Sequence, residues 1–164
     1  MADTSSTTPK YPLPSYQYQV GIKLNGTPTT MSFATVTGLT IRYNYTVYKE
    51  SMGDNDKKVR SLAMPAQMDK SNPIVFSRGI INSGTADDLL YLYAWIANAN
   101  YKTIDKREIT VNLCNEMGDA VVTWTLRDAF PIRLDAPTFD ASSNNPAIES
   151  LQVLVSNIEM TKAS

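Results

Sequence analysis

The chain has 164 residues, of which 43% are hydrophobic and 19% charged, and its formal net charge is −1. A length of this order suits one domain, and the balance of 15 Lys+Arg against 16 Asp+Glu argues against a dedicated nucleic-acid-binding domain, which needs a basic excess. The chain has no histidine and a single cysteine, Cys114. The commonest general base is therefore missing, and no disulfide forms within the chain.

The N-terminal segment has the composition of a flexible arm. Residues 1–10 are rich in Ser and Thr, and Pro12 and Pro14 follow them. A single domain is then expected over residues 11–164. The arm lacks the apolar core of a secretory signal, and no stretch approaches the roughly 18 consecutive apolar residues of a membrane-spanning helix. We therefore expect synthesis in the cytosol without a signal peptide, and no direct membrane span.

Alternation of apolar and polar residues marks the first strand. Over residues 16–24, tyrosines and aliphatic side chains alternate with glutamine, glycine and lysine, a period of two that is typical of a strand. An Asn-Gly pair at 25–26 predicts a hairpin turn. A second strand is expected over 31–37, and Gly38 is expected to form a bulge or bend before a third strand over 41–47.

Residues 50–71 show neither a helical nor a strand period. Charged residues crowd the middle of this segment, while Met52, Met64 and Met68 lie among smaller residues. A long segment without secondary structure is uncommon in a compact domain and is usually functional or disordered. Methionine packs well against irregular surfaces, so the sequence predicts an extended loop with a functional contact.

A helix is predicted after a short strand over 73–78. Thr85 and Asp88 have the spacing of a capping box at its start. The helix is apolar nearly all round, which normally means burial on all sides. We expect one face to cover the sheet and the opposite face to meet a neighbouring molecule. The first face consists of Leu89, Leu92, Tyr93 and Ile96, and the second of Leu90, Tyr91, Ala94 and Trp95.

The C-terminal part returns to strands, predicted over 108–114, 122–126 and 147–160. In the last of these, the side chains at 151, 153 and 155 are apolar, but so are Ile148, Leu154, Ile158 and Met160 on the other face. Either both faces have partners, or a bulge near Ser156 switches the inward parity. Seven strands and one helix predict a mainly β protein, an antiparallel β-sandwich or partly open barrel with one packed α-helix.

No residues form a convincing catalytic, metal or cofactor site. The acidic run at 54–56 lacks the glycine and distant glutamate of a calcium loop. Cys114 has no histidine to activate it and is expected to be a buried small hydrophobe. Asp135 and Asp140 lie among Pro, Ser and Asn, which favours turn interactions over paired-carboxylate catalysis. The sequence therefore predicts no enzyme, no metal and no cofactor.

Tyrosines offer a further interpretation. Spaced aromatic residues on a β-sandwich bind sugars or single-stranded nucleic acid. However, alternation places Tyr16, Tyr18, Tyr43 and Tyr45 on the apolar faces of their strands, which favours packing in the core or at an interface.

Several short motifs occur together in one order. They are Tyr11-Pro12-Leu13-Pro14, Val36-Thr37-Gly38-Leu39, Met64-Pro65, Arg78-Gly79, Trp95-Ile96, Ile109-Thr110-Val111, Gly118 with Trp124, Ala129-Phe130-Pro131, Phe139-Asp140-Ala141 and Ala147-Ile148-Glu149. In this order, from Tyr11 to Met160, the sequence resembles the tail tube proteins of contractile phages. It is most similar to the inner-tube subunits of contractile injection systems such as the antifeeding prophage and Photorhabdus virulence cassette particles.

The resemblance implies a non-enzymatic subunit that assembles into hexameric rings, which stack into a tube with a shared lumen-lining β-barrel. Implied partners are other copies of the chain, the sheath protein, baseplate or tube-initiator proteins and cap proteins, with protein cargo in the lumen and no nucleic-acid specificity. The loop over 50–71 would then lie between subunits. The predicted subunit interface comprises Met52, Met64, Met68, Leu90, Trp95, Leu154 and Ile158. Gln17 and Gln19 are predicted to face the lumen.

Other roles fit the same residues. A tube initiator, a baseplate ring protein or a secreted tube-like ring of the same machinery is one alternative, and a carbohydrate-binding β-sandwich is another. The resemblance also implies synthesis in the bacterial cytoplasm and a parent particle that is released or anchored to a membrane.

Overall fold

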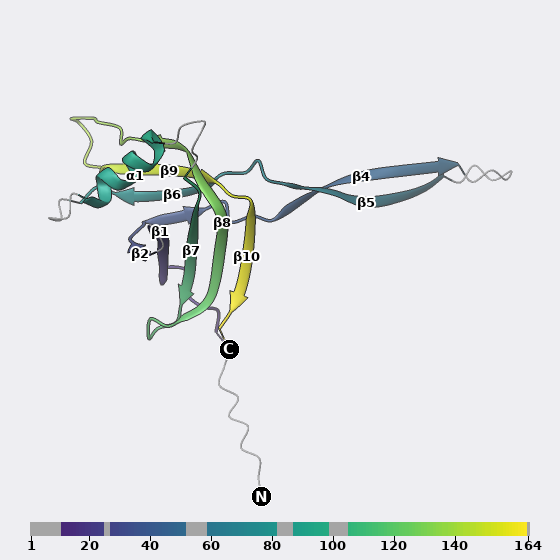
Figure 1. Ribbon diagram of the computed structural model, residues 1–164, viewed down its shortest axis with the longest axis horizontal. Helices are drawn as coiled ribbons and strands as arrows, with labels where there is room; N and C mark the ends of the chain where they lie inside the picture. Colours follow the sequence, from purple (N-terminus) through teal and green to yellow (C-terminus); the bar gives the residue numbers. More distant parts are fainter. Residues whose placement is uncertain (1–10, 25–26, 52–58, 82–86, 99–104, 164) are drawn as a thin grey trace, which may run out of the picture.

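The computed structural model describes residues 11–24, 27–51, 59–81, 87–98 and 105–163 (Figure 1). The predicted arm over 1–10, the turn at 25–26, the acidic run at 54–56 and the helix-capping Thr85 all lie outside these residues. The elements are β1 (Tyr18–Leu24), β2 (Thr27–Met31), β3 (Thr35–Thr37), β4 (Arg42–Ser51), β5 (Val59–Asp69), β6 (Ile74–Gly79), α1 (Asp87–Ala97), β7 (Arg107–Cys114), β8 (Ala120–Asp135), β9 (Ile148–Leu154) and β10 (Asn157–Lys162).

An eight-stranded antiparallel sheet forms the body of the described chain. Its strand order is β2-β1-β7-β8-β9-β6-β3, and β10 also pairs with β8. The 16-residue strand β8 belongs to both parts of this sheet, because residues 122–127 pair with β10 and residues 130–135 pair with β9. Between these stretches, Asp128 has a φ of 51°, and Figure 1 shows β8 curving from one set of strands to the other. The sheet therefore bends at this point.

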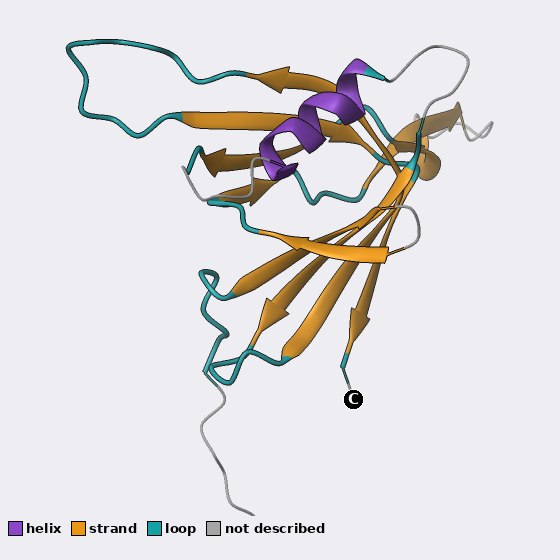
Figure 2. Cartoon of the chain, turned by 60° about the vertical axis from the view of Figure 1, so that its left-hand side comes forward, coloured by secondary structure: helices purple, strands orange, loops and turns teal. Residues whose placement is uncertain are grey.

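The bend encloses a single hydrophobic core. Apolar residues at alternate positions of each strand point into it, because successive side chains of a strand lie on opposite faces. The core residues are Val20, Ile22, Met31, Ile74, Phe76, Leu92, Trp95, Ile109, Val111, Leu126, Ala129, Leu151, Val153 and Ile158. Figure 2 shows the helix lying across one part of the sheet while the strands of the other part fan out below it. The prediction of a mainly antiparallel β fold with one packed helix is confirmed.

The predicted strand over 147–160 is two strands. Strand β9 ends at Leu154, and Ser156 donates a backbone hydrogen bond to the carbonyl oxygen of Arg127 (3.0 Å) before β10 begins. Leu151 and Val153 are buried before this break and Ile158 is buried after it, so the inward parity changes near Ser156. Of the two alternatives, a switch of parity is therefore the one that the structure supports.

The predicted strand over 31–37 is also divided. Residues up to Met31 pair with β1, whereas 35–37 pair with β6 on the other edge of the sheet. The chain thus crosses between the two parts of the sheet at residues 32–34. Gly38 follows with a φ of 86°, which confirms the expected bend.

Candidate assembly surfaces

A long β-hairpin projects from the body of the subunit. Strands β4 and β5 pair only with each other among the described strands, from Arg42↔Asp69 to Ser51↔Val59, and Figure 1 shows them extending away from the sheet. This corrects the prediction of an irregular loop over 50–71, since residues 59–69 form a regular strand. No strand period was recognisable because neither face of the hairpin packs on the core of the subunit.

Both faces of the hairpin carry exposed apolar side chains. By register, Tyr45 and Val47 lie on one face, and Tyr48, Leu62 and Met64 lie on the other. Tyr45 is 72% exposed and Met64 is 48% exposed. An isolated two-stranded hairpin is marginally stable in water, and a cluster of exposed apolar residues marks an interaction site. The β4–β5 hairpin, called the arm below, is therefore a candidate surface for contact with another protein.

The structure places the predicted methionines as follows. Met64 is exposed on the arm, Met68 is half-buried near its base, and Met52 lies outside the described residues. Tyr43 and Tyr45 are exposed on the arm, and Tyr16 is exposed beside β1, so core packing is wrong for these three tyrosines. Tyr18 does pack against the core, and its hydroxyl donates a hydrogen bond to the carbonyl oxygen of Phe33 (2.6 Å).

A second surface is the outer face of strands β1, β7, β8 and β10. Side chains here alternate with the buried ones, and neighbouring strands bring Gln19 opposite Asn112, and Asn112 opposite Thr123. The Thr123 hydroxyl donates a hydrogen bond to Asn112 Oδ1 (2.8 Å). Gln19 is exposed on this face, whereas Gln17 precedes β1 and is half-buried, with its buried Oε1 lacking a hydrogen-bond partner. The face is polar and rich in uncharged side chains.

Charges on this polar face form a row across four strands. Lys23 of β1 pairs with Glu108 of β7 (2.5 Å), Glu108 pairs with Arg127 of β8, and Arg127 Nη2 pairs with Glu159 of β10 (3.0 Å). The two positive and two negative side chains balance. The row therefore adds no net charge to the surface.

Lowering the pH is expected to weaken this row through Glu108. The Lys23 ammonium donates a hydrogen bond to the Glu108 carboxylate and holds its pKa below the ordinary 4.5, and Arg127 adds to this effect. Because the folded pKa is the lower one, the stabilisation is complete above pH 4.5 and is lost as the pH falls through the folded value. In urea titrations between pH 7 and 3, Glu108→Gln should show a shallower loss of the free energy of unfolding than the wild type. Parallel curves would contradict this.

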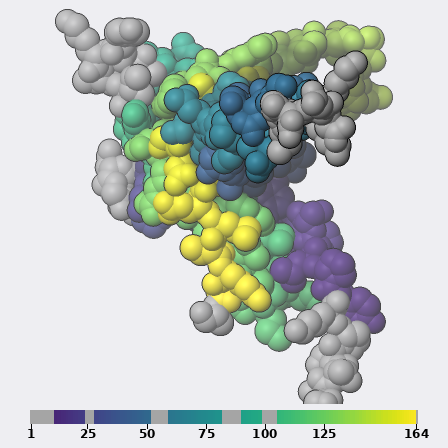
Figure 3. Space-filling model, turned by 90° about the vertical axis from the view of Figure 1, so that its right-hand side faces the viewer, coloured from purple at the N-terminus to yellow at the C-terminus, as the bar shows by residue number. Residues whose placement is uncertain are grey.

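The sheet has free edges next to the polar face. Strand β2 pairs only with β1, and β10 pairs only with β8, among the described strands. Figure 3 shows β10 in yellow along the surface of the molecule. Unpaired strand edges bind further strands unless they are covered, so both edges are candidates for contacts between subunits.

Helix α1 presents a third surface. Leu90 and Tyr93 are 64% and 63% exposed, three residues apart on one side of the helix. Leu92 and Trp95 are the residues that enter the core, and Trp95 is only 3% exposed. The predicted faces are therefore corrected: Tyr93 faces outward, and Trp95 belongs to the core rather than to a contact surface. The side chain of Leu89 lies outside the described part.

Of the two contacts predicted in the last strands, Ile158 is corrected and Leu154 stays a prediction. Ile158 is buried in the core of the subunit, because the chain switches parity before it, so it has little surface for a partner. Leu154 is half-buried and pairs with Phe130 of β8. Ile148 and Met160 are exposed.

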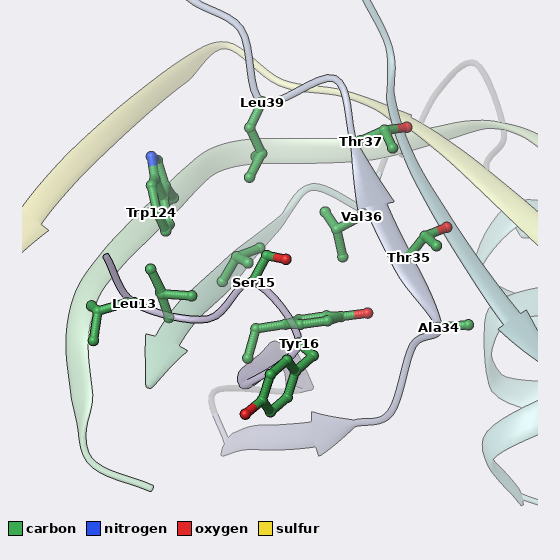
Figure 4. A pocket seen from close by; sticks show the side chains of 12 residues that line it. Leu13, Ser15, Tyr16, Ala34, Thr35, Val36, Thr37, Leu39 and Trp124 are labelled. Carbon is green, nitrogen blue, oxygen red and sulfur yellow. The ribbon is translucent and has the colours of Figure 1, made fainter. Parts of the chain in front are cut away.

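An apolar groove lies between β1, β3 and the ends of β7 and β8. It has a volume of about 600 Å³, and Figure 4 shows Leu13, Val36, Leu39 and Trp124 around it. The segment before β1 partly covers the groove through Leu13 and Ser15. The residues that line the groove include no acidic and no basic side chain.

Two residues that could in principle act in catalysis, Cys114 and Asp140, have structural roles. Cys114 is buried, as predicted. Asp140 Oδ1 accepts hydrogen bonds from the Ser142 backbone N–H (2.9 Å) and hydroxyl (2.7 Å), which confirms a turn. Within the described part of the chain, no group of three or more His, Cys, Asp or Glu side chains is placed to hold a metal ion. Among the same residues, no helix has the length and apolar character that crossing a membrane requires.

Solved structures of similar chains come from contractile particles. A chain of the anti-feeding prophage cap is 27% identical and has a TM-score of 0.78, with 99% of this chain and 100% of that chain covered. A chain of the PVC sheath–tube complex, from an extracellular contractile injection system in its extended state, gives the same four values. A chain of the PVC sheath/tube terminator is 28% identical with a TM-score of 0.77, covering 93% of this chain and 98% of that one. None of the curated proteins searched matches.

The family comparison covers most of the chain. Residues 14–159 match the model of the T4-like virus tail tube protein gp19. This stretch contains strands β1 to β9, the projecting hairpin among them, the helix and the first half of β10. The resemblance seen in the sequence is thus confirmed, and the chain belongs to the T4-like virus tail tube protein gp19 family.

Proposed function

We propose that this chain is the inner-tube subunit of a contractile injection system, forming hexameric rings that stack into a conduit driven through a target envelope when a sheath contracts. The observation that carries the proposal is the likeness, over 99% of this chain, to a chain of a sheath–tube complex. Three exposed surfaces of the subunit support it: the β4–β5 arm, the polar face with its free strand edges, and the outer side of helix α1. A structural role of this kind involves no enzymatic activity and no cofactor.

Rings close through the strand edges and the helix. The free edges of β2 and β10 lie on opposite sides of the polar face, so pairing between neighbours would continue one sheet around a lumen. Closing a sheet removes its edges, and a head-to-tail contact closes into a ring when the rotation between subunits permits. The polar face would then line the lumen with Gln19 and Asn112. Leu90 and Leu154 remain proposed contacts between subunits.

Rings stack through the β4–β5 arm. Strand β5 has 11 residues, which at about 3.3 Å per residue spans roughly 36 Å, far enough to leave the body of its own ring. The arm carries apolar side chains on both faces, as a segment inserted between two surfaces would. Met64 and Met68 are therefore proposed contacts with an adjacent subunit or ring, and Met52 stays a prediction.

The proposed partners follow from this architecture. They are further copies of the chain, a sheath protein, baseplate or tube-initiator proteins and a cap, with protein cargo inside the lumen. The particle would be released from the cell or anchored to a membrane. A neutral lumen with no basic excess supports transport without nucleic-acid specificity.

Negative-stain electron microscopy of the purified protein, and of its native particle, tests the proposal. Stacked rings of uniform diameter with sixfold symmetry are the expected result. A protein that stays monomeric up to high concentration and is absent from the tube of the particle would rule the proposal out.

A terminal position in the same particle is the second candidate. It is favoured by the likeness to chains of a cap structure and of a terminator structure, at 27% and 28% identity. A main tube subunit occurs in many copies per particle, and a tube initiator or terminal ring in few. Quantitative mass spectrometry of purified particles, with the sheath protein as reference, distinguishes the two.

Changing the polar face is expected to affect cargo rather than assembly. Gln17→Leu with Gln19→Leu replaces two uncharged polar side chains by apolar ones next to β7, so cargo would adhere to the wall. Tubes should form normally while the amount of co-purified cargo changes at least about twofold, since each apolar side chain adds on the order of 1 kcal/mol of contact. Because Gln17 is half-buried, Gln19→Leu alone is the control for local packing. Unchanged loading in both variants would refute a lumen position.

A further inference from the structure

The apolar groove between β1 and β3 has one wall that is the edge of a strand. Four successive residues, 34–37, line it, and three of them form β3. Because successive side chains of a strand lie on opposite faces, a wall built from consecutive residues presents the edge of the strand rather than one face. Among the described strands, β3 pairs only with β6. Its edge along the groove is therefore free to pair with a further strand.

The groove is open to solvent and apolar inside. Leu13 and Tyr16 line it and are 38% and 77% exposed, whereas Val111, which also lines it, is 4% exposed. Its volume of about 600 Å³ lies in the range of roughly 300–1,000 Å³ found for ligand pockets. A strand laid along this groove could bury apolar side chains and pair its backbone with β3, which are the two features of recognition by strand addition.

Among the described strands with a free edge, those of the arm suit this groove. The one large apolar residue of β2, Met31, is buried, and β10 exposes only Met160. Strands β4 and β5 pair only with each other, so their outer edges are free. Their exposed large apolar side chains are Tyr43, Tyr45, Val47, Tyr48, Val59, Leu62 and Met64.

One face of the arm is both apolar and uncharged in its middle part. Leu62 and Met64 of β5 lie on this face, and Tyr48 of β4 lies opposite Leu62. Charge appears only further along the same face, where Glu50 and Arg60 form an ion pair (4.0 Å). The lining of the groove has no acidic or basic side chain, so the two surfaces match in apolar character and in the absence of charge.

The arm does not reach the groove of its own subunit. Leu39 lines the groove, and the arm begins three residues later at Arg42. Tyr48 is six residues further along β4, roughly 20 Å from the start of the arm at about 3.3 Å per residue. Figure 1 shows the arm extending away from the sheet over this length. The groove that it fits is therefore that of another copy.

We propose that the arm face formed by Tyr48, Leu62 and Met64 docks in this groove of a neighbouring copy, where the outer edge of β5 pairs with β3. The inference rests on the proposed function, which brings identical copies together, and it names the surface that receives the arm. Docking covers the apolar side chains of both partners and completes two free strand edges.

Cysteine cross-linking in assembled tubes tests this contact. Leu62→Cys or Met64→Cys is combined with Thr35→Cys or Thr37→Cys, and a disulfide requires Cα atoms within about 7 Å. At least one of these four pairs should give a ladder of covalent oligomers on a non-reducing gel after oxidation. The native Cys114 is buried, and each single-cysteine variant is the control for background linkage. Met64→Cys with Phe139→Cys is the matched control pair, because Phe139 is 85% exposed and does not line the groove.

A charge in the groove provides an independent test. Thr37 is exposed on the groove wall, so Thr37→Lys should leave the melting temperature of the unassembled subunit unchanged. It should raise the critical concentration for tube assembly at least about tenfold, because docking would bury the ammonium without a partner. Thr138→Lys, at an exposed position of the β8–β9 loop outside the groove, should assemble like the wild type.

The outcomes separate this inference from the tube function. Intact tubes in which none of the four pairs cross-links above the control pair, or wild-type assembly by Thr37→Lys, overturn docking in the groove and leave the tube function standing. Wild-type protein that forms no tubes overturns both.

Discussion

The double substitution Leu62→Ser and Met64→Ser is expected to raise the critical concentration for tube assembly roughly 100-fold while leaving the fold of the subunit intact. These side chains are 41% and 48% exposed on one face of the β4–β5 arm. Burying the remaining surface of each on assembly contributes on the order of 1–1.5 kcal/mol, and about 2.7 kcal/mol corresponds to 100-fold. Sedimentation of tubes over a concentration series measures the effect.

Met117→Ser is the matched control for this variant. Met117 is 89% exposed in the β7–β8 turn, away from the arm, so its loss should change neither assembly nor folding. Circular-dichroism melting of the unassembled subunits should give the same transition for both variants and the wild type, because the arm contributes nothing to the core. An unchanged critical concentration for the arm variant would show that the arm does not connect rings.

Gly38→Ala is expected to destabilise the subunit by about 3 kcal/mol or more, the largest effect on folding that we predict for a single methyl group. Gly38 has a φ of 86°, and an added Cβ would lie 2.5 Å from the carbonyl oxygen of Pro73. The left-handed backbone costs about 1–2 kcal/mol for an L-residue, and the steric conflict adds about 1–3 kcal/mol. The backbone of Pro73 cannot rotate aside as a long side chain would. Urea unfolding of assembly-deficient protein measures the difference.

Alanine substitutions at two other glycines distinguish the cost of the left-handed backbone from the cost of the steric contact with Pro73. Gly118 has a φ of 89° with no atom within 4 Å of an added Cβ, so Gly118→Ala should cost only about 1–2 kcal/mol. Gly79 has open space and no positive φ, so Gly79→Ala should be neutral or stabilising by about 0.4–1 kcal/mol. If Gly38→Ala lowered the free energy of unfolding no more than Gly118→Ala does, the contact with Pro73 would not contribute to the cost.

The strands of the core were predictable because burial leaves a mark on the sequence. Where one face of a strand packs on the core and the other meets water, apolar and polar residues alternate, as in β1 and β7. The buried Val20, Ile22, Ile109 and Val111 all lie at the alternate positions that were expected to point inward. The order of short motifs also predicted the tube family, which residues 14–159 match. Local patterns sufficed for these features because each depends on neighbours along one strand or on motif order.

Features decided by contacts outside a single element were not predictable. The β4–β5 arm looked like a loop after residue 50, since a hairpin that packs on no core shows no inward face. The helix was apolar nearly all round, so its sequence predicted the inward position of Leu92 but not that Trp95 would enter the core while Tyr93 stayed outside. A pocket lined by Tyr91, Trp95 and Arg107 forms only where α1 meets the start of β7.

By itself, the sequence determined a mainly antiparallel β domain with one helix and its membership of the tail tube family. Only the tertiary structure decided where β8 bends, which way β10 leaves β9 and which apolar residues remain outside. The physical reason is that the sequence pattern shows which residues are apolar, whereas tertiary contacts with distant segments decide which of them are buried. Ile158 and Met160 share a face of one strand, yet only Ile158 is buried.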